Sequence, residues 1–182
     1  MTKGPRVVEY QDRWVQDFAW IRDELSRALA AVPHESIEHV GSTSVPGLAA
    51  KPVIDVDVIV LPAHVSSAIA ALVAIGYRHQ GDLGLEGREA FKAPDEGPRR
   101  HVYVCVAGSL HLRNHLAVRD VLRRRPDLRN AYAETKLSLV AQPGLEMASY
   151  IVGKSAILQR VLDESDLTPE EKAAIHRINR GA

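Results

Sequence analysis

The sequence contains only one cysteine, Cys105, among its 182 residues. An intramolecular disulfide is therefore excluded, as is typical of a protein in a reducing cytoplasm. No apolar stretch approaches the roughly 20 residues that a membrane helix needs. The opening Met1–Arg6 carries charge but lacks the apolar segment of a signal peptide. We therefore expect a cytoplasmic protein that does not enter a membrane.

Charge of one sign is not in excess either, because 23 Lys and Arg residues balance 23 Asp and Glu residues. A formal net charge of zero gives no global field that would favour nucleic acid or a membrane surface. This balance argues against a long nucleic-acid partner.

Several well-known functional motifs are absent as well. There is no Gly-x-x-x-x-Gly-Lys-(Ser/Thr) P-loop, no Gly-x-Gly-x-x-Gly fingerprint and no cysteine cluster for structural zinc. The serine-rich stretch 41–44 lacks the Gly-x-Ser-x-Gly elbow of α/β-hydrolases. The length suits one hydrophobic core, so we expect a single domain over residues 1–182.

The most informative stretch that is present couples a Gly41-Ser42 turn to the strand-like segment Asp55-Val56-Asp57. Side chains two apart on a strand share a face, so the two carboxylates point the same way. Two acids in an otherwise apolar strand are costly unless a cation neutralises them, and Mg²⁺ favours carboxylate oxygens. Backbone N–H groups and hydroxyls of the turn are suitable donors to phosphates. We therefore predict a site for Mg²⁺, or Mn²⁺, and phosphate.

The pattern resembles a known family. A Gly-Ser turn followed by an Asp-x-Asp strand resembles the nucleotidyltransferase superfamily signature. The run from His39 to Asp55 is similar to the hallmark of the GrpB family, His-Ile-Gly-Ser-Thr-(Ser/Ala)-Val-Pro-Gly-Leu-x-x-Lys-Pro-x-Ile-Asp. Further similar segments cover roughly residues 7 to 160: Arg88–Lys92, His101–Val104, His115–Arg123, and the Tyr-x-x-x-Lys pairs Tyr132/Lys136 and Tyr150/Lys154.

The resemblance implies an α+β fold, with a nucleotidyltransferase-like mixed sheet flanked by helices and a helical C-terminal half. It also implies that Asp55 and Asp57 bind one or two Mg²⁺ ions, while Gly41, Ser42 and Thr43 hold a triphosphate.

Sequence patterns predict an order of elements that agrees with this fold. Asp12 is a candidate N-cap for a helix that runs to about Val32, where Pro33 ends it. Thr168 and Glu171 resemble a capping box before the last helix. Strands are expected at 36–40, 53–60, near 77–78, 88–92 and 101–106, and helices at 62–75, 110–124, 128–140 and 145–164.

A third acid, which catalytic nucleotidyltransferases usually supply from a later strand, is missing from His101–Val106. Three interpretations remain open. The site works with two acids plus His101, as a ligand or general base. Alternatively, Glu86 or Glu89 supplies the acid, or the metal site is degenerate.

Basic residues outside the turn are further candidates for phosphate binding. Lys51 is either a phosphate contact or a solvated loop cation. Arg88 and Lys92 share one face of a predicted strand and could clamp phosphates.

The helical half presents the same choice. His115 and Arg119 are neighbours on a predicted helix and have a site role or a structural pairing with Asp120 or Glu134. Lys136 and Lys154 line the acceptor side or lie on a helix surface.

The leading hypothesis is a Mg²⁺-dependent enzyme that transfers a nucleoside monophosphate from a nucleoside triphosphate (NTP) to a small-molecule or protein acceptor. Asp55, Asp57 and His101 are its candidate catalytic residues, and Gly41, Ser42, Thr43, Lys51, Arg88 and Lys92 its candidate phosphate-binding residues. The alternative is a non-catalytic nucleotide- or CoA-related binding module with a degenerate metal site, since the family also occurs fused to dephospho-CoA kinase. A third hypothesis uses His101 and Asp55 as acid and base without a nucleotide.

Overall fold

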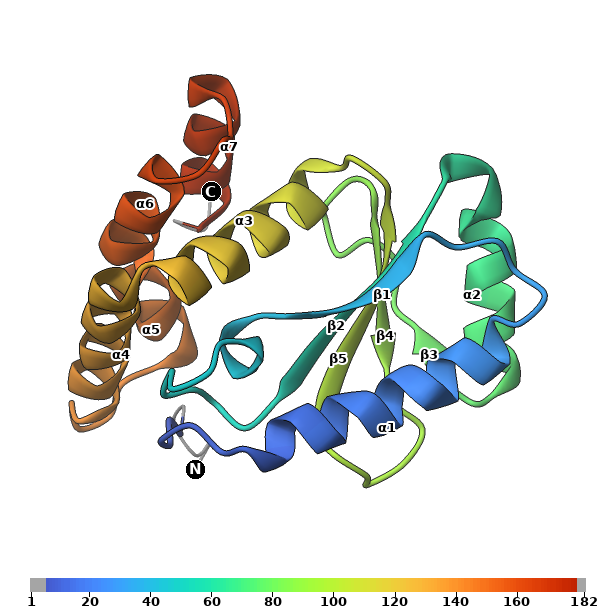
Figure 1. Ribbon diagram of the computed structural model, residues 1–182, viewed down its shortest axis with the longest axis horizontal. Helices are drawn as coiled ribbons and strands as arrows, with labels where there is room; N and C mark the ends of the chain where they lie inside the picture. Colours follow the sequence, from blue (N-terminus) through green and yellow to red (C-terminus); the bar gives the residue numbers. More distant parts are fainter. Residues whose placement is uncertain (1–5, 180–182) are drawn as a thin grey trace.

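The structure is a computed structural model that describes residues 6–179. Residues 1–5, on which most of the signal-peptide prediction depends, and residues 180–182 lie outside the described part. A mixed sheet forms one half of the described chain and helices form the other (Figure 1). The predicted α+β fold with a helical C-terminal half is confirmed.

The sheet has five strands in the order β1-β2-β5-β4-β3. β2 is parallel to β5, and the other neighbouring pairs are antiparallel. The strands are β1 (Ser36–Val40), β2 (Ile54–Val60), β3 (Arg78–His79), β4 (Arg88–Lys92) and β5 (Arg100–Val106). β2 thus has the internal position expected from its almost continuous apolar sequence.

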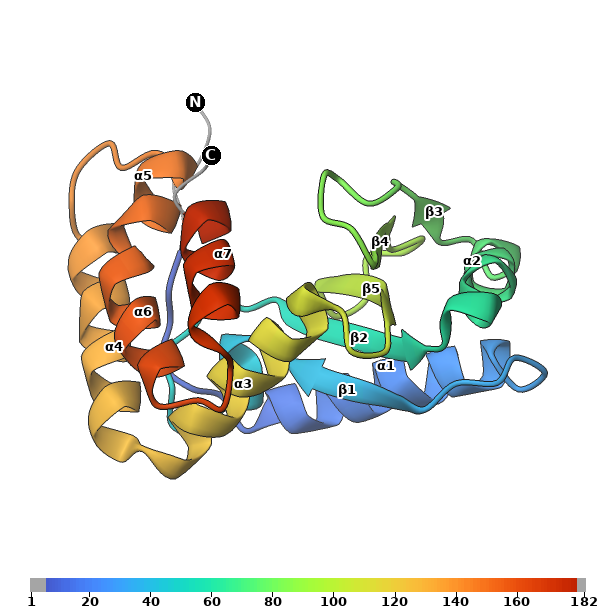
Figure 2. The same cartoon turned by 90° about the horizontal axis from the view of Figure 1, so that it is seen from above.

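Helices and short 3₁₀ turns connect and cover the strands. They are α1 (Arg13–Ala28), η1 (Ser42–Ser44), η2 (Pro62–His64), α2 (Val65–Ala74), α3 (Leu110–Arg124), α4 (Pro126–Val140), α5 (Met147–Gly153), α6 (Ser155–Asp163) and α7 (Pro169–Asn179). α3 leads away from the sheet to the bundle of α4–α7 (Figure 2). None of the helices in residues 6–179 has both the length and the apolar character that crossing a bilayer requires.

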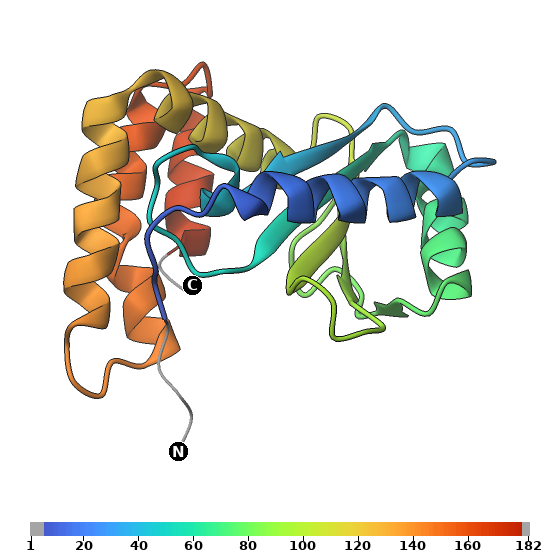
Figure 3. The same cartoon turned by 60° about the horizontal axis from the view of Figure 1, so that its bottom comes forward.

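Side chains of β2 alternate between the two faces of the sheet, and each face packs into a different hydrophobic cluster. Val56, Val58 and Val60 are fully buried with residues of α1 and α2 on one face. α1 runs along the sheet in Figure 3. Ile59 of the opposite face packs with Cys105 and with Leu112 of α3. Asp55 and Asp57 therefore belong to the face that α3 partly covers, and Cys105 is a buried core thiol.

Two helix predictions were wrong in detail. α1 ends at Ala28 rather than near Val32, and Asp12, although at the N-cap position, has helical dihedrals and makes no side-chain cap. The capping box of Thr168 and Glu171 is confirmed by two hydrogen bonds between side chain and backbone.

The single helix expected over 145–164 is broken into α5 and α6 at Lys154. Gly153 precedes the break, and a Cβ there would lie 2.6 Å from Cδ2 of Leu139 in α4. α5 therefore lies close to α4 at Gly153, and glycine has a low helix propensity. The break places Lys154 at a helix junction instead of inside a helix.

Candidate functional site

The Gly41 turn lies directly against Asp55. Gly41 has φ +70° and ψ −175°, a combination that only glycine adopts readily. A Cβ at this position would lie 2.3 Å from Oδ2 of Asp55. Glycine therefore suits this position for two reasons: its backbone conformation is strained for other residues, and a Cβ would clash with the carboxylate. The small size of glycine lets the backbone of the turn approach Asp55.

The two hydroxyls after Gly41 have different roles. Oγ1 of Thr43 donates to the carbonyl oxygen of Val53 at 3.1 Å and lies 3.0 Å from Nε2 of His39. It is buried and holds the turn together. Oγ of Ser42 instead accepts a hydrogen bond from Nζ of Lys136 at 3.0 Å. Ser42 and the backbone of the turn are therefore the groups that face the adjoining cavity.

This cavity, which we call the lysine pocket, has a volume of about 210 Å³. It lies where the turn, the open end of the sheet and the helical half meet. Three lysines and two tyrosines form much of its wall. Its lining residues are Gly41, Ser42, Thr43, Lys51, Val53, Asp55, His101, Tyr132, Lys136, Tyr150 and Lys154.

Lys136 and Lys154 are not helix-surface lysines. The side chain of Lys136 is buried, and its Nζ lies 4.3 Å from the centre of the Tyr132 ring. Nζ of Lys154 lies 4.6 Å from the centre of the Tyr150 ring. Each Tyr-x-x-x-Lys pair thus packs its lysine over its own tyrosine and directs both cations into the pocket.

Three lysines and one carboxylate, that of Asp55, line the lysine pocket. Burial, and then the charges of Lys154 and Lys51, lower the pKa of Lys136 to about 7. Burial also lowers the pKa of Lys51 and of Lys154. Within residues 6–179, none of the three ammonium groups has a carboxylate within 4.0 Å. Converging cations without a paired acid form a site suited to a polyanion.

Asp55 stands at the rim of the lysine pocket together with His101. Oδ1 of Asp55 lies 3.0 Å from Nδ1 of His101, its neighbour across β2 and β5. The side chain of His101 remains 48% exposed. The predicted site residues Gly41, Ser42, Thr43, Lys51, Asp55 and His101 therefore line one cavity.

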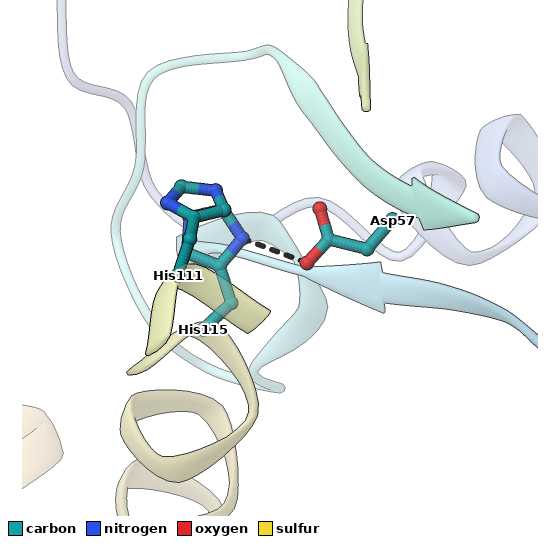
Figure 4. A group of neighbouring side chains, drawn as sticks. All are labelled: Asp57, His111 and His115. Carbon is teal, nitrogen blue, oxygen red and sulfur yellow. Dashed lines mark hydrogen bonds and ion pairs between the residues drawn. The ribbon is translucent and has the colours of Figure 1, made fainter. Parts of the chain in front are cut away.

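Asp57 lies deeper, under α3. It is fully buried, and its Oδ2 lies 2.9 Å from Nδ1 of His115 (Figure 4). Burial lowers the pKa of His115, but the charge and hydrogen bond of Asp57 outweigh burial, so the net shift is upward. Of the structural pairings considered for His115 and Arg119, the one with Asp120 is present for Arg119 only, and His115 pairs with Asp57 instead. Arg119 also pairs with Glu38.

His111 is a neighbour of this pair that sequence reasoning missed. Its ring centre lies 3.9 Å from that of His115. Ligand atoms of Asp57, His111 and His115 all lie within 4.8 Å of one another. The signal was present in the sequence, because two histidines four apart on a helix occupy one face.

The residues around Asp57 fit a divalent cation. Oδ1 of Asp57 is buried and has no hydrogen-bond partner among the described residues. A buried carboxylate oxygen without a donor is costly unless a cation or a proton meets it. Asp55 adds a second carboxylate on the same face of β2, and carboxylate oxygens suit Mg²⁺ and Mn²⁺.

On β5 no acid takes the place of the missing third carboxylate, and Glu38 of β1, which lies opposite Asp57, pairs with Arg119. Tyr103 of β5 lies opposite Asp57. Glu89 lies opposite Val104, on the other face of the sheet, and its Oε2 is 2.6 Å from Nε2 of His79. Glu86 lines a different cavity, between the loop before β4 and the start of α3.

Arg88 and Lys92 do not line the lysine pocket. β5 separates their strand, β4, from β2. The guanidinium of Arg88 lies 4.7 Å from the centre of the Tyr103 ring and donates to the carbonyl oxygen of Asp82. Lys92 is exposed and lies opposite Arg78 in the β3–β4 hairpin.

Comparisons with known proteins agree with this architecture. UPF0157 protein YqkA of Bacillus subtilis is 32% identical over 168 residues, which are 92% of this chain but 46% of that protein. UPF0157 protein SCO7215 of Streptomyces coelicolor is 35% identical over 163 residues, 85% of this chain and 83% of that protein. The chain thus spans about half the length of the Bacillus relative.

Two solved structures are similar. The crystal structure of the conserved protein GrpB from Enterococcus faecalis has a TM-score of 0.75 and 31% identity, and the match covers 93% of this chain and 99% of that one. A chain of the GLD-2/RNP-8 complex has a TM-score of 0.56 and 12% identity over 96% of this chain and 69% of its own. At that identity the likeness concerns the fold alone, which is nucleotidyltransferase-like. The family model described as GrpB protein matches residues 5–164, so the chain belongs to the GrpB family.

Proposed function

We propose that this protein binds an NTP by its phosphates in the lysine pocket and transfers the nucleoside monophosphate to a small-molecule or protein acceptor. The observation that carries the proposal is the convergence of Lys51, Lys136 and Lys154 on a Gly-Ser turn beside Asp55. Phosphates would supply the anionic partners that the three ammonium groups lack. They also match the backbone N–H groups and the Ser42 hydroxyl of the turn.

The aspartates would hold the divalent cation. Asp55 and Asp57 would bind Mg²⁺, or Mn²⁺, which supplies charge neutralisation to the phosphates during transfer. The chain's own contribution is positioning. The turn and the lysines orient the polyphosphate, and the tyrosines beneath the lysines keep their ammonium groups in place.

His101 is placed to handle the acceptor proton. With Nδ1–H donating to Asp55, Nε2 of the neutral imidazole is free to accept a proton. The acceptor hydroxyl or amine would lose that proton to His101 as its oxygen or nitrogen attacks the α-phosphorus. The bond from that phosphorus to the bridging oxygen then breaks, and pyrophosphate leaves.

A second candidate is nucleotide- or CoA-related phosphate binding without transfer. Two observations favour it. No third carboxylate accompanies Asp55 and Asp57 on β5, and Asp57 is fully buried against His115. The lysine pocket would then act as a binding site only.

Two measurements on the same samples separate the candidates. Calorimetric titration with Mg-ATP reports binding by the wild type, by Lys136→Met and by a Lys92→Met control at an exposed lysine. Incubation with α-phosphate-labelled ATP and a small-metabolite extract reports transfer. Binding with transfer that Asp55→Asn abolishes supports the first candidate. Binding without transfer selects the second, and no binding by the wild type overturns both.

A further inference from the structure

Beneath the lysine pocket, two histidines of α3 face the carboxylate of β2. His111 and His115 are separated by one helical turn and lie side by side, and His115 points its Nδ1 at Asp57 (Figure 4). Among residues 6–179, these three side chains are the only group of three or more His, Cys, Asp or Glu whose ligand atoms all lie within 4.8 Å of one another.

Hydrogen bonding within the chain satisfies this group only in part, through the contact of Asp57 Oδ2 with His115 and the neighbouring thiol of Cys105. Oδ1 of Asp57 and Nε2 of His111 are both buried without a partner among the described residues. Asp57 itself is fully buried. Buried polar atoms are normally paired, so two orphaned ligand atoms in one cluster indicate a bound species.

We propose that Asp57, His111 and His115 bind a divalent transition-metal ion, with Zn²⁺ as the reference member of the class. Two imidazoles and one carboxylate make a typical catalytic zinc ligand set, which leaves further positions for water or substrate. Mg²⁺ prefers oxygen ligands, whereas imidazole nitrogen favours transition metals. This donor set of one carboxylate and two imidazoles therefore favours a transition metal over Mg²⁺, whose proposed ligands are the two carboxylates of Asp55 and Asp57.

The geometry is close to that of a metal centre. Ligand atoms of a tetrahedral zinc site lie about 3.3 Å apart, as follows from bond lengths of about 2.0–2.1 Å. The 2.9 Å between Nδ1 of His115 and Oδ2 of Asp57 is near this value, and a metal ion bound by both atoms would displace the proton that they now share to solvent. All three ligand atoms lie within 4.8 Å of one another, so small side-chain adjustments would bring them to metal-binding distances.

A second cavity gives access to the cluster. It has a volume of about 590 Å³ and lies between the loop before β4, the start of α3 and α7. His111 forms part of its wall, together with Ser109 and Asn114, whose side-chain oxygens are also buried without partners. This cavity offers an entry path and room for an exogenous ligand on the metal.

The inference shares Asp57 with the proposed nucleotidyl transfer but needs neither nucleotide nor the lysines. Its test accordingly uses the metal alone. The full chain is freed of metal with a chelator and titrated with Zn²⁺ against a chromophoric competitor, and Co²⁺ is added in parallel to report tetrahedral coordination by its visible absorption.

We expect the wild type to bind one Zn²⁺ per chain with no displacement by excess Mg²⁺. His111→Gln should weaken Zn²⁺ binding at least about tenfold, since even outer-shell partners of a metal ligand contribute that much. His34→Gln, at an exposed histidine, is the matched control and should bind as the wild type does. Lys136→Met should lose NTP but keep Zn²⁺, which separates this site from the proposed function.

His115→Gln removes the partner of a buried acid and could unfold the chain. His111→Gln, checked by circular dichroism, therefore decides the question. Absence of stoichiometric Zn²⁺ binding by the wild type would overturn the proposal, as would equal affinity in a folded His111→Gln variant.

Discussion

Nζ of Lys136 donates a hydrogen bond to Oγ of Ser42 across 3.0 Å. The contact joins α4 of the helical half to the turn of the sheet half, between residues 94 apart in the sequence. It places the buried ammonium group of Lys136 beside the Gly41-Ser42 turn, which we propose binds phosphate. Burying a cation without an acid is unfavourable for folding, so a ligand is the natural partner for this charge.

The first prediction concerns the stability cost of Lys136. Its pKa falls from an ordinary 10.5 to about 7, so the folded state disfavours the charged form. Below pH 7 Lys136 is protonated in both the folded and the unfolded state, so burial of the charge lowers the free energy of unfolding by its full amount. Between pH 7 and 10.5 only the unfolded chain keeps the proton, so this loss of stability disappears as the pH rises.

We therefore expect Lys136→Met to raise the free energy of unfolding at pH 6 by several kcal/mol, on the order of 3–5 from the pKa difference. At pH 10 the gain should be small. Urea denaturation at the two pH values measures it, and Lys92→Met at an exposed position should show no such change. A Lys136→Met protein that is less stable than the wild type at pH 6 would refute the prediction.

The second prediction concerns the pH dependence of ligand affinity. Lys136 must be protonated to attract phosphate, so pyrophosphate affinity should fall as pH rises above about 7. The decline should approach about tenfold per pH unit. Because phosphate itself titrates near pH 6, the quantity to compare is the affinity ratio of wild type to Lys136→Met. A ratio that stays constant from pH 6 to pH 9 would contradict the role of Lys136.

The third prediction separates the two reasons why position 41 favours glycine, which are its backbone conformation and its close contact with Asp55. Gly41→Ala adds a Cβ that would meet Oδ2 of Asp55 at 2.3 Å, whereas a Cβ at Gly84 would meet nothing within 4 Å. Both glycines have positive φ. Gly84→Ala should therefore cost only backbone strain, about 1–3 kcal/mol.

Gly41→Ala should cost more and should also weaken Mg-ATP binding, because the turn is displaced from Asp55. Thermal unfolding and calorimetry on both variants test this. Equal destabilisation of the two would show that the contact with Asp55 is unimportant.

The fourth prediction isolates proton handling by His101. Its side chain is half exposed and linked to Asp55 rather than to the lysines. His101→Gln should therefore leave Mg-ATP affinity nearly unchanged and lower the rate of transfer about 10²- to 10⁴-fold, the usual range for a general base. A variant that loses affinity while keeping its turnover rate would assign His101 to binding instead.

The turn, the strands and the shared face of Asp55 and Asp57 could be predicted from the sequence because they depend on local patterns. Strand alternation and glycine chemistry act over a few residues. The burial of Lys136 depends on how α4 packs against a turn that is remote in the chain. The Tyr-x-x-x-Lys spacing of Tyr132 and Lys136 does not by itself distinguish a pocket from a helix surface.

The partner of Asp57 illustrates the same limit. The sequence suggested His101 as the completing group, yet His101 meets Asp55, and Asp57 meets His115 from α3, 58 residues away. Such contacts depend on tertiary structure, which the local spacing of apolar residues in the sequence does not encode.

The most direct test of phosphate binding in the lysine pocket is a crystal structure with Mn²⁺ and a non-hydrolysable NTP. We predict phosphate oxygens within hydrogen-bond distance of Lys136 and Ser42, with anomalous density for Mn²⁺ on Asp55 or Asp57. Phosphates bound away from the lysines, or a pocket that stays closed to the nucleotide at saturating concentration, would contradict the proposed function.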